Sequence, residues 1–272
     1  GEYLRRVLTG CVVVPVVFAC FVYPLVTFIL GSACVFAAAL EFYPLANKIR
    51  PIPESRAVMA IHSLAFAASC YIDPTVGIYV GFIGSFCFRI SQLEAADKER
   101  QKRIVDVILF DLFFIVAIVF PISFVIRFGY LTRGASWKFL MFFVTWQTDN
   151  GCLLFGRLFG KHKCAPVLSP GKTWEGVFGG WFFNFISIEI LRYFTGDAVL
   201  PTMSLENSLH ISILFIFTGQ IGDLAESFFK RCAEVKDSGT LFPGHGGMLD
   251  RLDSLVLGGP ALTAYIHLLS LG

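Results

Sequence analysis

The sequence predicts an all-α integral membrane protein with about nine transmembrane helices. Of its 272 residues, 56% are hydrophobic and only 15% are charged, and the mean hydropathy is +0.70. An average soluble domain carries roughly 25% charged residues, and a soluble chain of this length needs more polar surface to cover its exterior. These values exclude a soluble globule, a disordered chain and a disulfide-framework fold. The apolar runs lack the alternation of a β-barrel, so the spanning segments are expected to be helices.

Nine apolar runs are long enough to be candidate spans. A helix needs about 20 residues to cross a hydrocarbon layer of ~30 Å. The runs lie at about 7–26, 27–46, 57–72, 74–93, 107–126, 137–156, 174–194, 208–229 and 252–271. The segment from Gln92 to Asp106, between the fourth and fifth runs, is charged throughout and predicts a cytoplasmic surface helix.

The basic residues fix the expected orientation. If the N-terminus is cytoplasmic, 18 of the 22 lysines and arginines lie on the cytoplasmic side. The other side keeps Arg127, Arg133, Lys138 and Arg192. This bias follows the positive-inside rule and predicts a cytoplasmic N-terminus and an external C-terminus.

Three polar clusters interrupt the C-terminal half, and this topology places all three at the cytoplasmic membrane face. The first is the stretch from Gln147 to Asn150, inside an apolar run. A carboxylate within a membrane helix is costly, so Asp149 needs a partner or a water-filled cavity. Two interpretations stay open for Asp149: a hydrogen-bonding group between helices, or a group that binds a ligand or metal in a cavity.

The second cluster runs from Gly156 to Gly176 and ends at the start of a predicted helix. Cations beside a helix N-terminus favour phosphate, because the free N–H groups and the helix dipole both attract anions. A solvated positive loop is the alternative. The triplet Gly171-Lys172-Thr173 is not a P-loop, because Pro166 stands where that motif needs glycine. The cations are Arg157, Lys161, Lys163 and Lys172.

The third cluster runs from Gly219 to Ser254. Its first part has the spacing i, i+3, i+4, i+7, which places Asp223, Glu226, Ser227 and Lys230 on one helix face. A glycine-rich loop follows, and glycines allow the backbone to approach a ligand closely. Carboxylates, cations and such a loop together are typical of a divalent cation that holds a polyphosphate. A network of structural salt bridges is the alternative.

The third cluster also resembles a known signature. The pattern is Ser227-x2-Lys230-Arg231-x4-Lys236-Asp237-x-Gly239-x2-Phe242-Pro243-x-His245-Gly246-Gly247-Met248-x-Asp250-Arg251-Leu252-Asp253. It resembles the signature of the phosphatidate cytidylyltransferases without a gap. The segment from Ser169 to Gly176 and the stretch from Asp149 to Lys161 are similar to two further blocks of that family. Gly171 stands where the family commonly has lysine, and Asn150 where it has threonine.

The resemblance implies an enzyme that converts CTP and phosphatidic acid to CDP-diacylglycerol and pyrophosphate. It implies Mg²⁺, with room for a second cation, and no nucleic-acid partner. The implied metal ligands are Asp223, Asp250, Glu226 and Asp253. The implied catalytic residues are Asp223, Lys230, Arg231, Lys236, Asp237, His245, Asp250, Arg251 and Asp253. The implied substrate-binding residues are Asp149, Arg157, Lys161, Ser169, Lys172, Thr173, Glu175, Ser227, Gly246 and Gly247.

The expected organisation follows from these assignments. Residues 1–136 would form a scaffold of five spans and the surface helix near 92–106, and residues 137–272 the catalytic membrane region. Small residues of the second span, Gly31 and Ala37–Ala39 among them, allow close helix approach and leave a homodimer open. The expected location is a bacterial inner membrane, with the site facing the cytoplasm and membrane lipids around it.

Two other functions compete with this interpretation. A transporter or channel would have charged groups near the bilayer middle and repeated halves, whereas here the ionisable residues gather at one face. A CTP-dependent lipid kinase would transfer the γ-phosphate to an alcohol, and the intact 227–253 signature argues against it.

Overall fold

The predicted all-α class is confirmed. The computed structural model describes residues 23–51, 56–92, 98–242 and 246–269. These residues form helices joined by turns and loops, and their only β-type pairing is two isolated bridges. The predicted first span at 7–26 lies almost entirely outside the described residues.

The chain divides into two compact units. The first unit combines Gly1–Arg127 with Lys230–Arg251, and the second combines Phe128–Phe229 with Leu252–Gly272. A segment near the C-terminus therefore packs with the N-terminal helices. The predicted division into a scaffold and a catalytic region is a functional one and stays a prediction.

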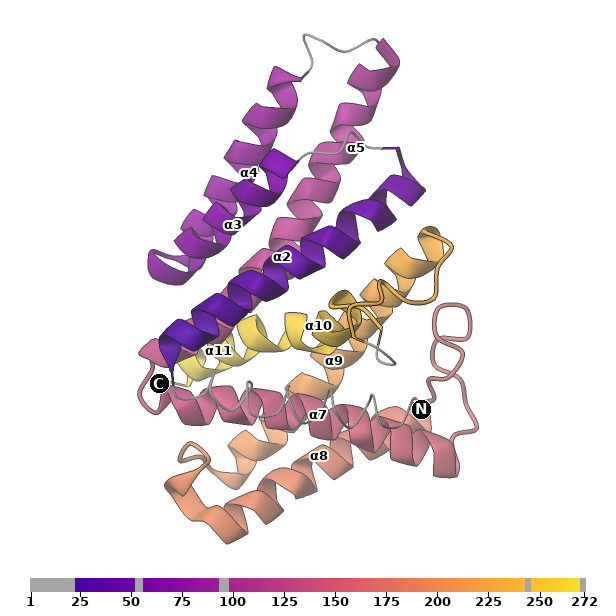
Figure 1. Cartoon of the computed structure of the whole chain (residues 1–272). Helices are drawn as coiled ribbons and strands as arrows, with labels where there is room; N and C mark the ends of the chain where they lie inside the picture. The colour runs from indigo at the N-terminus through magenta and orange to yellow at the C-terminus, as the bar shows by residue number, and fades with distance from the viewer. Residues whose placement is uncertain (1–22, 52–55, 93–97, 243–245, 270–272) are drawn as a thin grey trace. The chain divides into compact units, whose positions relative to one another are not determined.

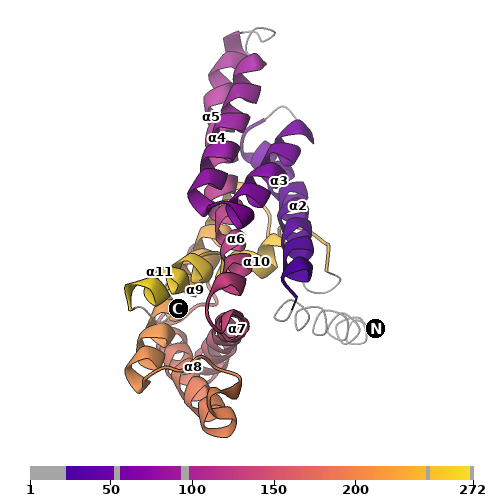
Figure 2. The same ribbon diagram turned by 90° about the vertical axis from the view of Figure 1, so that its left-hand side faces the viewer.

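In the first unit, α2 packs against α3 and α6, and α4 packs against α3 and α5 (Figures 1 and 2). Both α2 and α4 begin with proline, which has the φ that a first helical turn requires and lacks the N–H that would be left unpaired there. The helices of this unit are α2 (Pro24–Ile49), α3 (Arg56–Tyr71), α4 (Pro74–Ser91), α5 (Lys98–Phe114), the π-helical turn η1 (Ile115–Val119) and α6 (Phe120–Arg127).

The fifth predicted span is one helical run from Lys98 to Arg127 with a π-helical turn inside it. The turn comes just before Pro121, whose ring would clash with the carbonyl of Ala117 in a regular α-helix, so the widened turn accommodates it. The charged residues 98–106 are the first turns of α5. They are not a separate surface helix, and residues 93–97 lie outside the described part.

The interior of the first unit contains a buried ion pair. Arg89 of α4 donates from Nε to Oδ2 of Asp111 on α5 over 2.8 Å and from Nη2 to Oδ1 over 3.2 Å. Tyr43 of α2 donates a third hydrogen bond to Asp111, over 2.7 Å. Both charged side chains are only 1% exposed. Because each charge has a partner, the cost of burying it among apolar helices is offset.

The second unit is built around α7 and α8, which pack against each other along much of their length (Figure 1). Their contact needs glycine, since a Cβ on Gly179 would lie 2.2 Å from Cβ of Phe155 and one on Gly180 would lie 2.4 Å from Sγ of Cys152. Such close approach is typical of membrane helices. The elements are η2 (Phe128–Tyr130), α7 (Gly134–Phe159), α8 (Trp174–Thr195), η3 (Gly196–Ala198), most of α9 (Leu205–Cys232), the end of α10 (Leu249–Val256) and α11 (Gly258–Leu268).

The predicted last span, 252–271, is not a single helix. It is divided at Leu257 between α10 and α11. Two glycines follow, and Pro260 has no N–H to donate to the carbonyl of Val256, so a continuous helix loses a hydrogen bond there. At 1.5 Å per residue α11 rises only ~16 Å, about half of the hydrocarbon thickness.

Four helical stretches of the described residues are long and apolar enough to cross a membrane: Pro24–Ile49, Pro74–Ser91, Arg103–Tyr130 and Leu205–Cys232. A shorter apolar helix lies at Val58–Tyr71. The chain is accordingly an integral membrane protein, whereas the number of nine spans and their orientation stay predictions.

Candidate functional site

The second unit contains an ion pair between two predicted site residues. Lys172 lies just before α8, and its Nζ is 2.7 Å from Oδ2 of Asp223 on α9. The same ammonium donates to Oε1 of Gln220 over 2.9 Å, and the Ser227 hydroxyl donates to Oδ1 of Asp223 over 3.3 Å. The Asp223 side chain is 34% exposed. A cation and a carboxylate thus meet at an accessible position.

The start of α8 has its own hydrogen-bond acceptors. The Thr173 hydroxyl accepts from the N–H of Gly176 over 3.2 Å and caps the helix. The Glu175 carboxylate accepts from the N–H groups of Lys161 and His162, each over 3.1 Å, and pairs with the His162 ring. These contacts hold the basic loop 160–173 to the helix and give Thr173 and Glu175 a structural role. Arg157 and Lys161 have exposed side chains, and the Ser169 carbonyl accepts from the N–H of Lys172.

The first and third polar clusters also touch within the second unit. The hydroxyl of Ser254 lies 3.5 Å from Oδ1 of Asp149, and its backbone N–H donates to Oδ1 of Asp253 over 2.6 Å. Asp149 is exposed, on α7. Ser254 therefore connects the two predicted carboxylates.

In the first unit, Asp250 is surrounded by donors. Lys230 donates to its Oδ1 over 2.6 Å, and its Oδ2 accepts from the N–H groups of Ser238 (3.0 Å) and Gly247 (2.8 Å). Burial alone would raise the pKa of Asp250, but the hydrogen bonds from Lys230 and from those two N–H groups outweigh it and lower the pKa to about 2. Asp250 is therefore ionised and holds the loop that precedes it.

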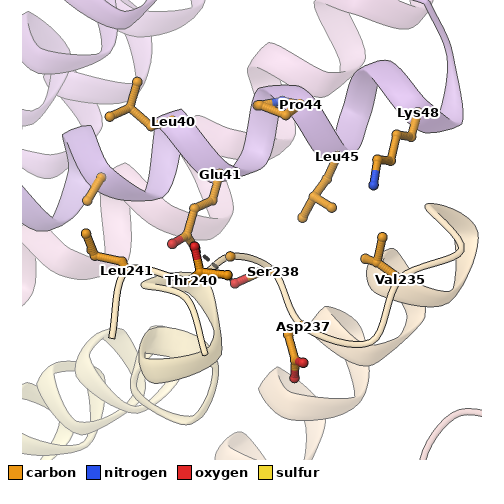
Figure 3. A pocket seen from close by; sticks show the side chains of 12 residues that line it. Leu40, Glu41, Pro44, Leu45, Lys48, Val235, Asp237, Ser238, Thr240 and Leu241 are labelled. Atoms are coloured by element: carbon orange, nitrogen blue, oxygen red, sulfur yellow. Dashed lines mark hydrogen bonds between the residues drawn. The ribbon is translucent and has the colours of Figure 1, made fainter. Parts of the chain in front are cut away.

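A second carboxylate, which the sequence did not identify as a site residue, holds the same loop from α2. Glu41 accepts from the N–H of Met248 over 2.8 Å and from the N–H of Leu249 over 3.1 Å, at the start of α10. The Ser238 hydroxyl lies 2.9 Å from both Glu41 and Asp250. Figure 3 shows Glu41 pointing from α2 toward Ser238, at a cavity of about 410 Å³ between α2 and residues 235–241.

The glycines of this loop fit around the two carboxylates. Gly246 has a φ of +83°, and a Cβ on it would lie 2.6 Å from Oδ2 of Asp250. A Cβ on Gly239 or Gly247 would lie 2.5 Å or 2.3 Å from a carboxylate oxygen of Glu41. The sequence predicted that glycines here allow a ligand to approach, whereas in the structure they allow internal carboxylates to approach.

The remaining predicted residues have simpler surroundings. Arg231 donates to the carbonyl of Val235 over 2.9 Å, and Lys236, Asp237 and Arg251 are exposed. Glu226 lies on α9 and is partly buried. His245 lies outside the described residues.

Four residues that make hydrogen bonds or ion pairs with the predicted site residues, or with the loop that contains them, were not identified from the sequence: Glu41, Ser238, Gln220 and His162. Only Glu41 carried a signal, since it is a carboxylate in an otherwise apolar run, where an unpaired charge is costly.

The described residues contain no group of three or more His, Cys, Asp or Glu side chains that could hold a metal ion. Mg²⁺ is usually bound by one or two carboxylates together with substrate phosphates. Asp223 fits that pattern, because its side chain is 34% exposed and, beside the ion pair of Oδ2 with Lys172, its Oδ1 accepts a long hydrogen bond of 3.3 Å from Ser227. Asp250 fits less well, because both of its oxygens already accept from protein donors.

Comparison with known proteins decides the family. A family model described as the cytidylyltransferase family matches residues 4–269. The chain belongs to the cytidylyltransferase family. It is similar to proteins named phosphatidate cytidylyltransferase from Staphylococcus aureus (strain COL), with 43% identity over 137 residues, and from Staphylococcus haemolyticus (strain JCSC1435), with 46% identity over 135 residues.

The alignment with these two relatives covers only part of each chain. The aligned region is 50% of this chain and 51% of the Staphylococcus aureus protein, and 49% and 50% for the Staphylococcus haemolyticus protein. The chain thus spans about half the length of the curated relatives it matches.

Proposed function

We propose that this member of the family is a phosphatidate cytidylyltransferase, which transfers the CMP group of CTP to phosphatidic acid and releases pyrophosphate. The observation that carries the proposal is the similarity to relatives of that name, 43–46% identical over half the chain. The apolar helices support it, because a phosphatidic acid substrate is held in the bilayer.

The reaction needs little acid–base help. The phosphate monoester of phosphatidate is already an anion near pH 7, since its second pKa is about 6. One of its oxygens attacks the α-phosphorus of CTP, and the bond to the β-phosphate oxygen breaks to release pyrophosphate. Catalysis then depends on positioning and on neutralising negative charge.

In the second unit, the Lys172–Asp223 pair supplies a cation for the phosphates and a carboxylate for a metal ion. Lys172 donates to a phosphate oxygen of CTP once the nucleotide competes with Asp223 for the ammonium. Asp223, with Glu226 three residues later on α9 and Asp253 of the same unit, would hold Mg²⁺ together with the phosphates. The ion supplies charge neutralisation at the triphosphate when bound. Exposed Asp149, Arg157 and Lys161 of the same unit contribute to substrate binding.

In the first unit, the loop 238–250 and Lys230 are the proposed phosphate contacts. Asp250 orients Lys230 and fixes the backbone at Gly247, which lies beside Gly246. The exposed cations Arg231, Lys236 and Arg251 add positive charge for the anionic substrates.

The proposed setting is a bacterial inner membrane with a cytoplasmic site, nine spans and an N-terminus inside. Bacterial relatives and the sorting of basic residues support it. A homodimer stays open. The small residues of α2 are partly used inside the first unit, since a Cβ on Gly31 would lie 2.8 Å from Phe66 and Ala38 is fully buried.

One assay tests the function. The purified chain in detergent is incubated with Mg²⁺, CTP and phosphatidate, and both pyrophosphate and CDP-lipid are measured. We expect equal amounts of the two products and no product after chelation with EDTA. CDP formation together with phosphorylation of diacylglycerol would instead indicate a lipid kinase, and ion flux into vesicles without CDP-lipid formation would indicate a transporter.

A further inference from the structure

We propose that Glu41 of α2 is a positioning residue for the transfer reaction, acting through residues 238–239 and 247–250. The inference rests on the proposed function for its kinetic part and on the contacts of the first unit for its structural part. Glu41 belongs to no polar cluster of the C-terminal half and lies 207 residues from Met248 in the chain.

The first argument is the set of donors that Glu41 receives. Its Oε1 accepts from the N–H of Met248, and its Oε2 accepts from the N–H of Leu249. These two N–H groups belong to the start of α10, where a helix has no internal acceptors for them. Glu41 therefore caps α10 from a distant helix and sets where the helix begins.

The second argument is the position of Asp250 one residue farther on. Asp250 fixes Lys230 and the N–H groups of Ser238 and Gly247. The Ser238 hydroxyl lies between the two carboxylates, 2.9 Å from each. A displacement of Leu249 therefore also displaces Asp250, and with it the ammonium that Asp250 orients.

The third argument is steric. A Cβ on Gly239 would have three near neighbours, Oε1, Cδ and Cγ, all of the Glu41 side chain, at 2.5, 2.6 and 3.0 Å. The loop therefore packs directly on the carboxylate. Figure 3 shows Glu41 at the wall of the cavity that α2 shares with residues 237–241.

The chemistry requires a carboxylate at this position. A glutamine side chain has the same shape, but its amide nitrogen donates and would face an N–H donor of Met248 or Leu249. An aspartate keeps the acceptors but is shorter by one methylene group, so it reaches only part of the donor set. We expect Glu41→Asp to retain more activity than Glu41→Gln.

The kinetic test compares Glu41→Gln, Glu41→Asp and the matched control Glu206→Gln, which removes an exposed carboxylate at the start of α9. For Glu41→Gln we expect kcat to fall at least about 10-fold, with a higher KM for CTP and a KM for phosphatidate within about 2-fold, because misplaced groups act on the nucleotide phosphates. Glu206→Gln should stay within about 2-fold of the parent protein. Equal kcat in Glu41→Gln and Glu206→Gln overturns the proposal.

A double-mutant cycle tests the geometry. Gly239→Ala should lower activity at least about 10-fold when Glu41 is present, and should lower it further by less than about 2-fold in a Glu41→Ala background, because the obstructing carboxylate is gone. Independent effects of the two substitutions would contradict the contact.

A readout without catalysis separates this proposal from the proposed function. Hydrogen exchange of the peptide 246–250 should be at least about 10-fold faster in Glu41→Gln than in the parent protein, since one of the N–H groups of Met248 and Leu249 then faces a donor instead of an acceptor. Unchanged exchange refutes the anchor even if activity falls. If the parent protein forms no CDP-lipid, the proposed function fails, and the exchange result alone decides whether Glu41 anchors the loop.

Discussion

Arg89 and Asp111 form a two-pronged ion pair inside the first unit, with Nε–Oδ2 and Nη2–Oδ1 distances of 2.8 and 3.2 Å. Tyr43, which donates to Asp111, lies two positions after Glu41 on α2. The ion pair joins α4 to α5, and the hydrogen bond from Tyr43 to Asp111 joins α2 to them.

The first prediction concerns this pair. Asp111→Asn leaves the Arg89 charge buried without its counter-charge and should lower the free energy of unfolding by about 3–5 kcal/mol. The double variant Arg89→Leu with Asp111→Leu should lose much less, because no charge remains buried. Thermal unfolding in detergent measures both.

The control is a surface pair of the same unit. Arg50 and Asp106 are 3.7 Å apart, with side chains 65% and 39% exposed. Arg50→Gln should change the free energy of unfolding by less than about 1 kcal/mol. If Arg50→Gln and Asp111→Asn lower the free energy of unfolding equally, burial of the Arg89–Asp111 pair does not determine the cost of breaking it.

The second prediction is a pH dependence at Asp250. Its pKa is lowered from 3.8 to about 2 in the folded protein, so the ionised carboxylate stabilises the fold. This contribution is complete above about pH 5 and is lost as the pH falls through about 2, and it amounts to about 2 kcal/mol. The difference in unfolding free energy between the parent protein and Asp250→Asn should therefore shrink between about pH 5 and pH 2. A difference that stays constant over this range contradicts the lowered pKa.

The third prediction concerns the pair of Lys172 and Asp223. Lys172→Ala and Asp223→Asn should each lower kcat/KM about 100-fold, because both act on the developing charge of the phosphates. The double variant should be little worse than either single variant, since the two groups act as a unit. Pyrophosphate release measures all three. Lys98→Ala, which removes an exposed lysine at the start of α5, is the control for the loss of one positive charge.

The fourth prediction concerns the contact between α7 and α8. Gly179→Ala would place a Cβ 2.2 Å from Cβ and Cγ of Phe155 and should destabilise the second unit by about 1–3 kcal/mol. Gly171→Ala, whose Cβ would have no neighbour within 4 Å, should stay within about 0.5 kcal/mol. If both variants unfold at the same temperature, α7 and α8 do not approach each other as closely as described at Gly179.

Hydropathy predicted the helices well because a membrane helix must satisfy its own backbone and therefore has a long apolar sequence. The runs at 27–46, 74–93 and 208–229 correspond to α2, α4 and α9. The division of the run 252–271 into α10 and α11 was not predicted, because mean hydropathy does not register the hydrogen bond that Pro260 removes.

Long-range contacts could not be predicted in the same way. Lys172 and Asp223 were both identified from local patterns, but their pairing depends on where the loop before α8 meets α9. Glu41 was not identified as a site residue, because the N–H groups that donate to it lie about 200 residues later in the chain. The approach of a ligand to the glycines at 239 and 247 stays a prediction, and in the structure the group that lies close to both is the Glu41 carboxylate.

The assembly of the first unit from two distant stretches has a consequence for the order of synthesis. Glu41 leaves the ribosome 207 residues before Met248 does. At a translation rate of about 5–20 residues per second, this delay is roughly 10–40 s. During that time the N-terminal helices have been made, but the loop that Glu41 holds does not yet exist. The first unit is therefore completed only after nearly the whole second unit has been synthesised.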